Sequence, residues 1–145
     1  MRILAVDLGV KRTGLAICDA AEMLASPIGT VTEGNPEKLL TTVADTARDK
    51  AAEMILVGLP KNMDGTHGAS AQRAEVFATR LREITSLPVK LWDERMTTVT
   101  AIGFLNATDV RGKKRKAVVD TVSAVIILEN YLQYRKNHPK ENVHG

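Results

Sequence analysis

A length of 145 residues with 44% apolar side chains fits one globular domain with a hydrophobic core, which excludes a disordered or fibrous chain. The single cysteine excludes an internal disulfide, as expected for a cytoplasmic protein, and no run of about 18 apolar residues could cross a membrane. The net charge of +3 is modest, so the positions of the charges are more informative than their sum.

The first third of the chain predicts three short strands. Residues 3–8 are apolar up to Asp7, residues 14–19 form a second run after a basic, glycine-containing turn, and residues 24–32 form a weaker run that Pro27 and Gly29 interrupt. Strands this close together in sequence favour an antiparallel meander.

Helices and strands then alternate. A helix opened by Pro36 has Leu39, Leu40, Val43, Ala47 and Ala51 at helical spacing, and a second helix over 70–84 has its core face at Ala74, Phe77, Leu81 and Ile84. We also expect strands at 54–57 and 89–92, a short helix at 97–105, a polar loop at 109–116 and a last helix at 117–134. The order predicts a single α/β domain over residues 1–135, with a mixed sheet and a disordered tail over 136–145.

Acidic residues interrupt three of these apolar elements. Asp7 ends the first strand, the pair Asp93 and Glu94 ends the last strand, and Asp120 lies in what we expect to be the first turn of the last helix. An isolated carboxylate in an apolar segment is costly to desolvate unless it is paired or binds a metal. Ligands of open α/β sheets gather at strand ends, so the pattern predicts a carboxylate cluster that holds Mg²⁺ or Mn²⁺.

Each acid also has an ordinary explanation. Asp7 could belong to a turn, Asp120 could cap a helix, and Asp93 or Glu94 could pair with Arg95. The three positions taken together favour the cluster, which is the donor set that two-metal hydrolysis of a phosphodiester requires. Because strand side chains alternate, Asp93 and Glu94 should face opposite sides, and only one should be a primary ligand.

Basic residues accompany every acidic position. Such a rim predicts salt-dependent binding of a polyanion, recognised through its backbone or shape because no aromatic residues are interleaved with the densest block. The competing interpretation is a solvated surface loop. The candidate nucleic-acid-binding residues are Lys11, Arg12, Lys61, Arg95, Arg111, Lys113, Lys114, Arg115 and Lys116.

Other catalytic sites have little support. The three histidines are scattered, so neither a zinc site nor a histidine-based nucleophilic site is indicated. Gly9 and Gly14 have the spacing of a Walker A loop, but Leu15 stands where a lysine is required. Cys18 is expected to be a buried strand residue.

Four segments resemble the YqgF/RuvX family. They are DLGVKRTGLA from Asp7, VGLPKNMDG from Val57, DERMTT from Asp93 and KAVVD ending at Asp120. The resemblance covers about residues 1–134 and is specific because four motifs occur in order. It implies a ribonuclease H-like fold, with a mixed five-stranded sheet flanked by helices. It also implies catalytic acids at Asp7, at Asp93 or Glu94, and at Asp120, with Asp7, Glu94 and Asp120 as the preferred metal ligands.

Members of this family are described as candidate nucleases for pre-16S rRNA and as candidate Holliday junction resolvases. The resemblance therefore implies a metal-dependent endonuclease of structured nucleic acid, with processing of the 5′ end of pre-16S rRNA as the first expectation. Cleavage of branched DNA is the nearest alternative and would require a homodimer rather than a monomer. A non-catalytic nucleic-acid-binding module is the second alternative, and a phosphotransferase of the actin and sugar-kinase superfamily is the third.

Overall fold

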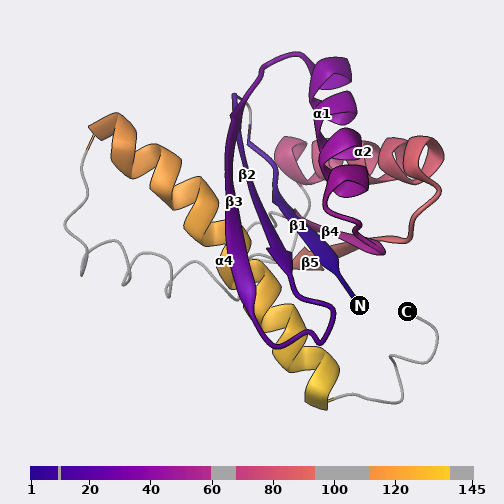
Figure 1. Ribbon diagram of the computed structural model, residues 1–145. Helices are drawn as coiled ribbons and strands as arrows, with labels where there is room; N and C mark the ends of the chain where they lie inside the picture. The colour runs from indigo at the N-terminus through magenta and orange to yellow at the C-terminus, as the bar shows by residue number, and fades with distance from the viewer. Residues whose placement is uncertain (10, 60–67, 94–111, 138–145) are drawn as a thin grey trace.

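The computed structural model describes residues 1–9, 11–59, 68–93 and 112–137, and for residues 59, 70, 93 and 112–121 it describes the backbone only. These residues form a five-stranded mixed sheet with helices on both faces (Figure 1). The expected helix at 97–105 lies outside this description.

The first three strands form the expected antiparallel meander. They are β1 (Ile3–Asp7), β2 (Arg12–Cys18) and β3 (Ala25–Thr32), and β2 pairs with both of its neighbours. β3 forms one edge of the sheet, where its proline removes no hydrogen bond of a central ladder.

The next segment supplies two parallel crossovers. It runs through α1 (Pro36–Asp49), β4 (Met54–Leu59), α2 (Ala69–Thr85) and β5 (Val89–Asp93). Asn35 caps α1 by accepting hydrogen bonds from the backbone N–H groups of residues 37 and 38. Because β4 pairs in parallel with β1 and with β5, the strand order is β3-β2-β1-β4-β5.

Two expected core positions in the helices are wrong. Ala51 lies beyond the end of α1, exposed, with a φ of 56°. Ile84 lies in the last turn of α2 and is 47% exposed. The other helix core residues are confirmed as buried, and Phe77 and Leu81 are among them.

The last helix is longer than expected. α4 spans Gly112–Asn137, so the expected loop at 109–116 is wrong from Gly112 onward, and the helix continues past the predicted tail boundary at 136. Repulsion between neighbouring lysines on a helix costs only tenths of a kcal/mol per pair, about 0.2–0.5 kcal/mol. The high helix propensity of lysine and arginine outweighs this repulsion.

Figure 1 shows α1 and α2 on one face of the sheet and α4 on the other, and a hydrophobic core lies on each face. On one face, Leu4 and Val6 of β1 pack with residues of α1 and α2. On the other face, Ile3 and Ala5 of the same strand pack with the stripe of α4 that contains Ala124, Ile127, Leu128 and Tyr131. The alternation along β1 therefore determines which helix layer each side chain faces.

An ion pair joins the end of α4 to the turn between β2 and β3. Arg135 Nε donates to Glu22 Oε1 at 2.6 Å, and both side chains are mostly buried. Burial opposes a charged carboxylate, but hydrogen bonds from Arg135 and from the amino group of Met1 outweigh it and hold the pKa of Glu22 below its ordinary value of 4.5.

This lowered pKa predicts a specific loss of stability in acid. A carboxylate with a depressed folded-state pKa contributes stability above pH 4.5, and the contribution disappears as the pH falls through the depressed value. Thermal melts between pH 7 and pH 3 should show that Glu22→Gln is less stable than the parent at pH 7 and converges with it in acid. Glu83→Gln, on an exposed part of α2, is the control. A constant difference between Glu22→Gln and the parent at every pH would contradict this account.

Candidate active site

Asp7 lies at the carboxyl edge of the central strand, on the α4 face of the sheet. Its neighbours Val6 and Leu8 pack into the core on the α1 and α2 side, whereas Ala5 packs into the α4 core. Asp7 therefore faces α4, as Ile3 and Ala5 do, and it is half-buried. The parallel strands β4 and β5 end at the same edge of the sheet.

Glycines flank Asp7 on both neighbouring strands. Asp7 pairs with Gly14 of β2, and on the other side β1 and β4 pair in register up to Val6 and Val57, so Gly58 comes level with Asp7. Side chains at cross-strand positions on one face normally contact each other. Gly14 and Gly58 have no side chains. β2 and β4 therefore place no side chain beside the Asp7 carboxylate, and other groups can approach it on the α4 face of the sheet.

Gly14, Asp7 and Gly58 form a row across three neighbouring strands, and Trp92 of β5 is the next residue in this row. It pairs with Gly58, lies on the α4 face, and is two strands from Asp7, roughly 10 Å at about 4.8 Å per strand. Its ring packs edge-on against Tyr131 and Tyr134 of α4, with centroids 5.4 Å away in both pairs. Lys90 lies over the Tyr131 ring at 5.3 Å. The row therefore ends at a cluster of three aromatic side chains on the β5 side.

Asp120 lies on α4 in line with the helix stripe that covers the sheet. It is four residues before Ala124, which is fully buried against β1 and β2, and Leu128 follows at the same interval. Residues spaced by four share one face of a helix. The expected place in the first turn is wrong, because Asp120 is eight residues after Gly112, more than two turns into the helix. The helix dipole acts within the first turn and does not explain this acid.

The remaining acids lie beyond what the structure describes. β5 ends at Asp93, whose side chain is not part of the description, and Glu94 lies outside the described residues. Among the side chains that are described, no three histidine, cysteine or carboxylate groups lie together as a metal site. The Asp7 carboxylate is a hard oxygen donor, the ligand type that divalent cations such as Mg²⁺ prefer.

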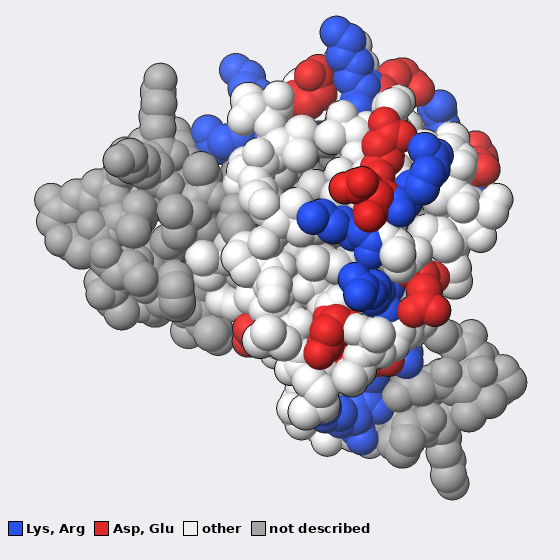
Figure 2. Space-filling model, viewed as in Figure 1, with Lys and Arg blue, Asp and Glu red and all other residues white. Residues whose placement is uncertain are grey.

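The structure describes some of the candidate basic residues and not others. Lys11 is exposed in the turn after Asp7. Arg12 begins β2, is half-buried, and lies on the same face of the sheet as Gly14, which is the face that α4 covers. Lys113, Lys114, Arg115 and Lys116 belong to the first turns of α4, whereas Lys61, Arg95 and Arg111 lie outside the described residues. Figure 2 shows acidic and basic side chains interspersed over the face in view, so that face is not a single-sign binding surface.

Cys18 is a buried strand residue, as expected. Its side chain is 2% exposed, and burial raises the pKa of the thiol. A thiol with these properties stays protonated and is a poor nucleophile.

Sequence reasoning missed two glycines beside Asp7 and one arginine that binds the turn after it. Gly14 and Gly58 can be found only when strand register is known, although a glycine within a strand is itself a signal of close approach. Arg73 of α2, whose Nη2 donates to the Gly9 carbonyl at 3.2 Å, carried no sequence signal that distinguished it from other helical arginines.

Comparisons with known proteins place the chain in a family. A family model described as "RuvX: Holliday junction resolvase" matches residues 1–134. Proteins named "Putative pre-16S rRNA nuclease" are similar along nearly their whole length: the one from Thermoanaerobacter pseudethanolicus is 41% identical over 94% of this chain and 99% of its own, and the one from Halothermothrix orenii is 42% identical over 93% and 96%.

Solved structures share the fold at low sequence identity. The Thermus thermophilus RuvC in complex with a Holliday junction substrate is 12% identical, with a TM-score of 0.63 over 94% of this chain and 96% of that one. The fowlpox virus Holliday junction resolvase is 13% identical, with a TM-score of 0.55 over 92% and 99%. The expected ribonuclease H-like fold, a mixed five-stranded sheet flanked by helices, is thereby confirmed. No helix in the described part of the chain is both long and apolar enough to span a membrane.

Proposed function

Because the chain belongs to the RuvX family, we propose that it is a metal-dependent endonuclease that hydrolyses phosphodiester bonds of structured nucleic acid, with the 5′ end of pre-16S rRNA as its substrate. One observation carries the proposal: Asp7 stands at the carboxyl edge of the central strand between two glycines, at the place where open α/β sheets bind ligands. The names of the relatives at about 40% identity support the RNA substrate.

In this proposal Asp7, Glu94 and Asp120 hold the cation, Mg²⁺ or Mn²⁺. Glu94 is preferred to Asp93 because it continues the interval of two from Lys90 and Trp92, which both lie on the α4 face. Asp93 remains the alternative acid at this strand end. When bound, a divalent cation supplies activation of the attacking water and stabilisation of the leaving oxygen. The chain's own carboxylates orient that centre, and the glycines beside Asp7 let the phosphodiester approach.

The proposed binding residues are Lys11, Arg12, Lys61, Arg95, Arg111 and the four basic residues at positions 113–116. The placement of the last four supports the proposal. Cations in the first turn of a helix oppose its dipole, each at a cost of about 0.3–1 kcal/mol, and the first turn of α4 contains Lys113, Lys114 and Arg115 but no acid. Their positions are therefore poor for helix stability and suited to a polyanion.

Binding of a labelled RNA or junction should depend steeply on salt. Neutralising about six phosphates of duplex DNA predicts a loss of roughly 10³-fold in affinity between 50 and 200 mM salt. Lys114→Ala should reduce the slope of log K against log salt by about 1, because one phosphate contact is lost. Lys136→Ala, exposed at the other end of the same helix, should leave the slope unchanged. A flat salt response would overturn the proposed interface.

The biological substrate is tested by depletion in the native bacterium. Accumulation of unprocessed 16S precursor, restored by the parent gene and not by an Asp7→Asn copy, is the expected result. Accumulation of junction intermediates with normal precursor processing would instead assign the protein to DNA resolution. The description of the family as Holliday junction resolvases favours this second candidate, which requires a two-fold dimer, whereas RNA processing is compatible with a monomer.

A binding module and a phosphotransferase would each behave differently from a nuclease. A non-catalytic binding module would keep its function in Asp7→Asn, and a phosphotransferase would bind ATP tightly.

We further propose that residues 1–135 act as one nuclease domain in the cytoplasm, where 16S precursors are processed.

A further inference from the structure

The turn that follows Asp7 is fastened from two distant parts of the chain. Arg73 Nη2 of α2 donates to the carbonyl oxygen of Gly9 at 3.2 Å, across 64 positions of sequence. On the other side, the backbone N–H of Glu33 donates to the Lys11 carbonyl at 2.9 Å. The first of these two hydrogen bonds comes from a side chain, so a single substitution can remove it.

Gly9 makes this turn tight. A β-carbon added to Gly9 would lie 2.0 Å from the carbonyl oxygen of Arg12, which is far inside contact distance. The backbone of Gly9 therefore lies close to the backbone of Arg12. A shift of Gly9 is transmitted in one direction to Asp7, two residues before it, and in the other to Lys11 and Arg12.

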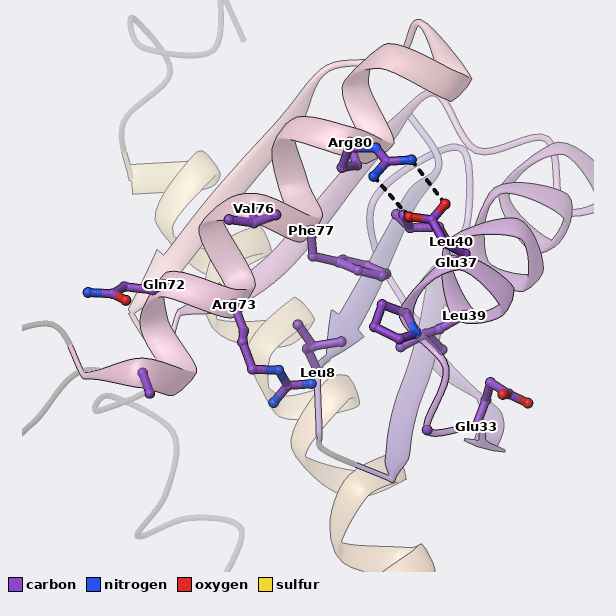
Figure 3. A pocket seen from close by; sticks show the side chains of 13 residues that line it. Leu8, Glu33, Glu37, Leu39, Leu40, Gln72, Arg73, Val76, Phe77 and Arg80 are labelled. Carbon is purple, nitrogen blue, oxygen red and sulfur yellow. Dashed lines mark hydrogen bonds and ion pairs between the residues drawn. The ribbon is translucent and has the colours of Figure 1, made fainter.

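Arg73 is placed to act on this turn. Its side chain extends from α2 beside Leu8, at the end of a groove of about 480 Å³ between α1 and α2 (Figure 3). Arg80, on the same helix, makes a two-pronged ion pair with Glu37 of α1 at 2.9 and 3.0 Å. The two arginines therefore serve different contacts: Arg80 joins two helices, whereas Arg73 joins α2 to the backbone of the turn.

We propose that Arg73 is a positioning residue that holds the turn after Asp7 through the Gly9 carbonyl. It thereby orients Asp7, Lys11 and Arg12 for the reaction. The catalytic half of this inference rests on the proposed function. A charged donor strengthens a hydrogen bond to a carbonyl oxygen, and its geometry fixes the backbone that carries the acid. A misplacement of about 1 Å at a reacting centre reduces rates by about 10²-fold. In this proposal Arg73 acts through its hydrogen bond to the turn.

The test compares Arg73→Ala, Arg73→Lys and the matched control Arg80→Ala in the full chain. Amide hydrogen exchange is measured over residues 5–14, which needs no activity. We expect exchange in this segment to rise at least about tenfold in Arg73→Ala and to stay at the parent level in Arg80→Ala. In Arg73→Lys, which keeps a charged donor group without the guanidinium geometry, exchange should return partly. An unchanged exchange rate in Arg73→Ala would overturn the inference.

Cleavage kinetics test the catalytic half. On a pre-16S leader fragment with Mg²⁺, Arg73→Ala should lower kcat by about 10–100-fold with little change in KM, while Arg80→Ala keeps the parent kcat. The positioning role would be overturned if Arg73→Ala and Arg80→Ala lost kcat equally and in proportion to their losses of melting temperature. That result would show that Arg73 has a merely structural role. If the parent protein cleaves no substrate, the proposed function fails, and hydrogen exchange alone decides whether Arg73 holds the turn.

Discussion

Asp7→Asn should abolish cleavage while nucleic-acid binding is retained. The substitution keeps the shape of the side chain but removes the negative charge that a divalent cation requires. Loss of several kcal/mol of transition-state stabilisation corresponds to roughly 10³-fold in rate at about 1.36 kcal/mol per tenfold. Binding should be unchanged or slightly tighter, because a carboxylate beside a phosphate repels it. Single-turnover cleavage and a filter-binding titration measure the two effects separately.

The same chemical change at Asp45 is the control. Asp45 is exposed on α1 and pairs only weakly with Arg48 at 3.3 Å, on the opposite side of the sheet from α4. Asp45→Asn should therefore cleave at the parent rate. Cleavage at the parent rate by a folded Asp7→Asn protein would remove Asp7 from the catalytic site.

Gly9→Ala should inactivate the protein through the backbone alone. The added methyl group meets the Arg12 carbonyl oxygen at 2.0 Å, and a main-chain atom cannot rotate away as a flexible side chain can. The turn must open, which should cost about 1–3 kcal/mol of stability and displace the neighbouring Asp7. We expect a lower melting temperature together with a loss of cleavage larger than the melting temperature explains.

Gly34→Ala is the matched control for this change. A β-carbon at Gly34 meets nothing within 4 Å, so the same substitution should leave stability and cleavage near the parent values. Equal behaviour of the two variants would show that the turn after Asp7 tolerates displacement, and it would weaken the role given to Arg73 as well.

The sequence predicted the parts of the fold that depend on local pattern. The meander of β1 to β3 and the helix begun by Pro36 follow from apolar runs and capping chemistry, and both are confirmed. The start of α4 at Gly112 was missed because a dense block of like charges is typical of a loop, although here helix propensity outweighs that repulsion.

The catalytic role of the acids stays a prediction, and the surroundings of Asp7 were missed. Asp7 stood out because a carboxylate interrupts an apolar strand. Gly14, Gly58 and Trp92 share its row only through strand register, and Arg73 reaches the turn only through the packing of α2. Register and helix packing depend on contacts between distant segments, so a single sequence does not contain them in readable form.

A cleavage assay with two substrates tests the central claim most directly. Purified protein is incubated with a pre-16S rRNA leader fragment or a synthetic four-way DNA junction, each with Mg²⁺, Mn²⁺ or EDTA. The account predicts cutting of the leader fragment with either metal, no cutting in EDTA, and little or no cutting of the junction. Binding of both substrates without cutting under any condition would contradict the nuclease, and metal-dependent cutting of the junction alone would contradict the RNA substrate.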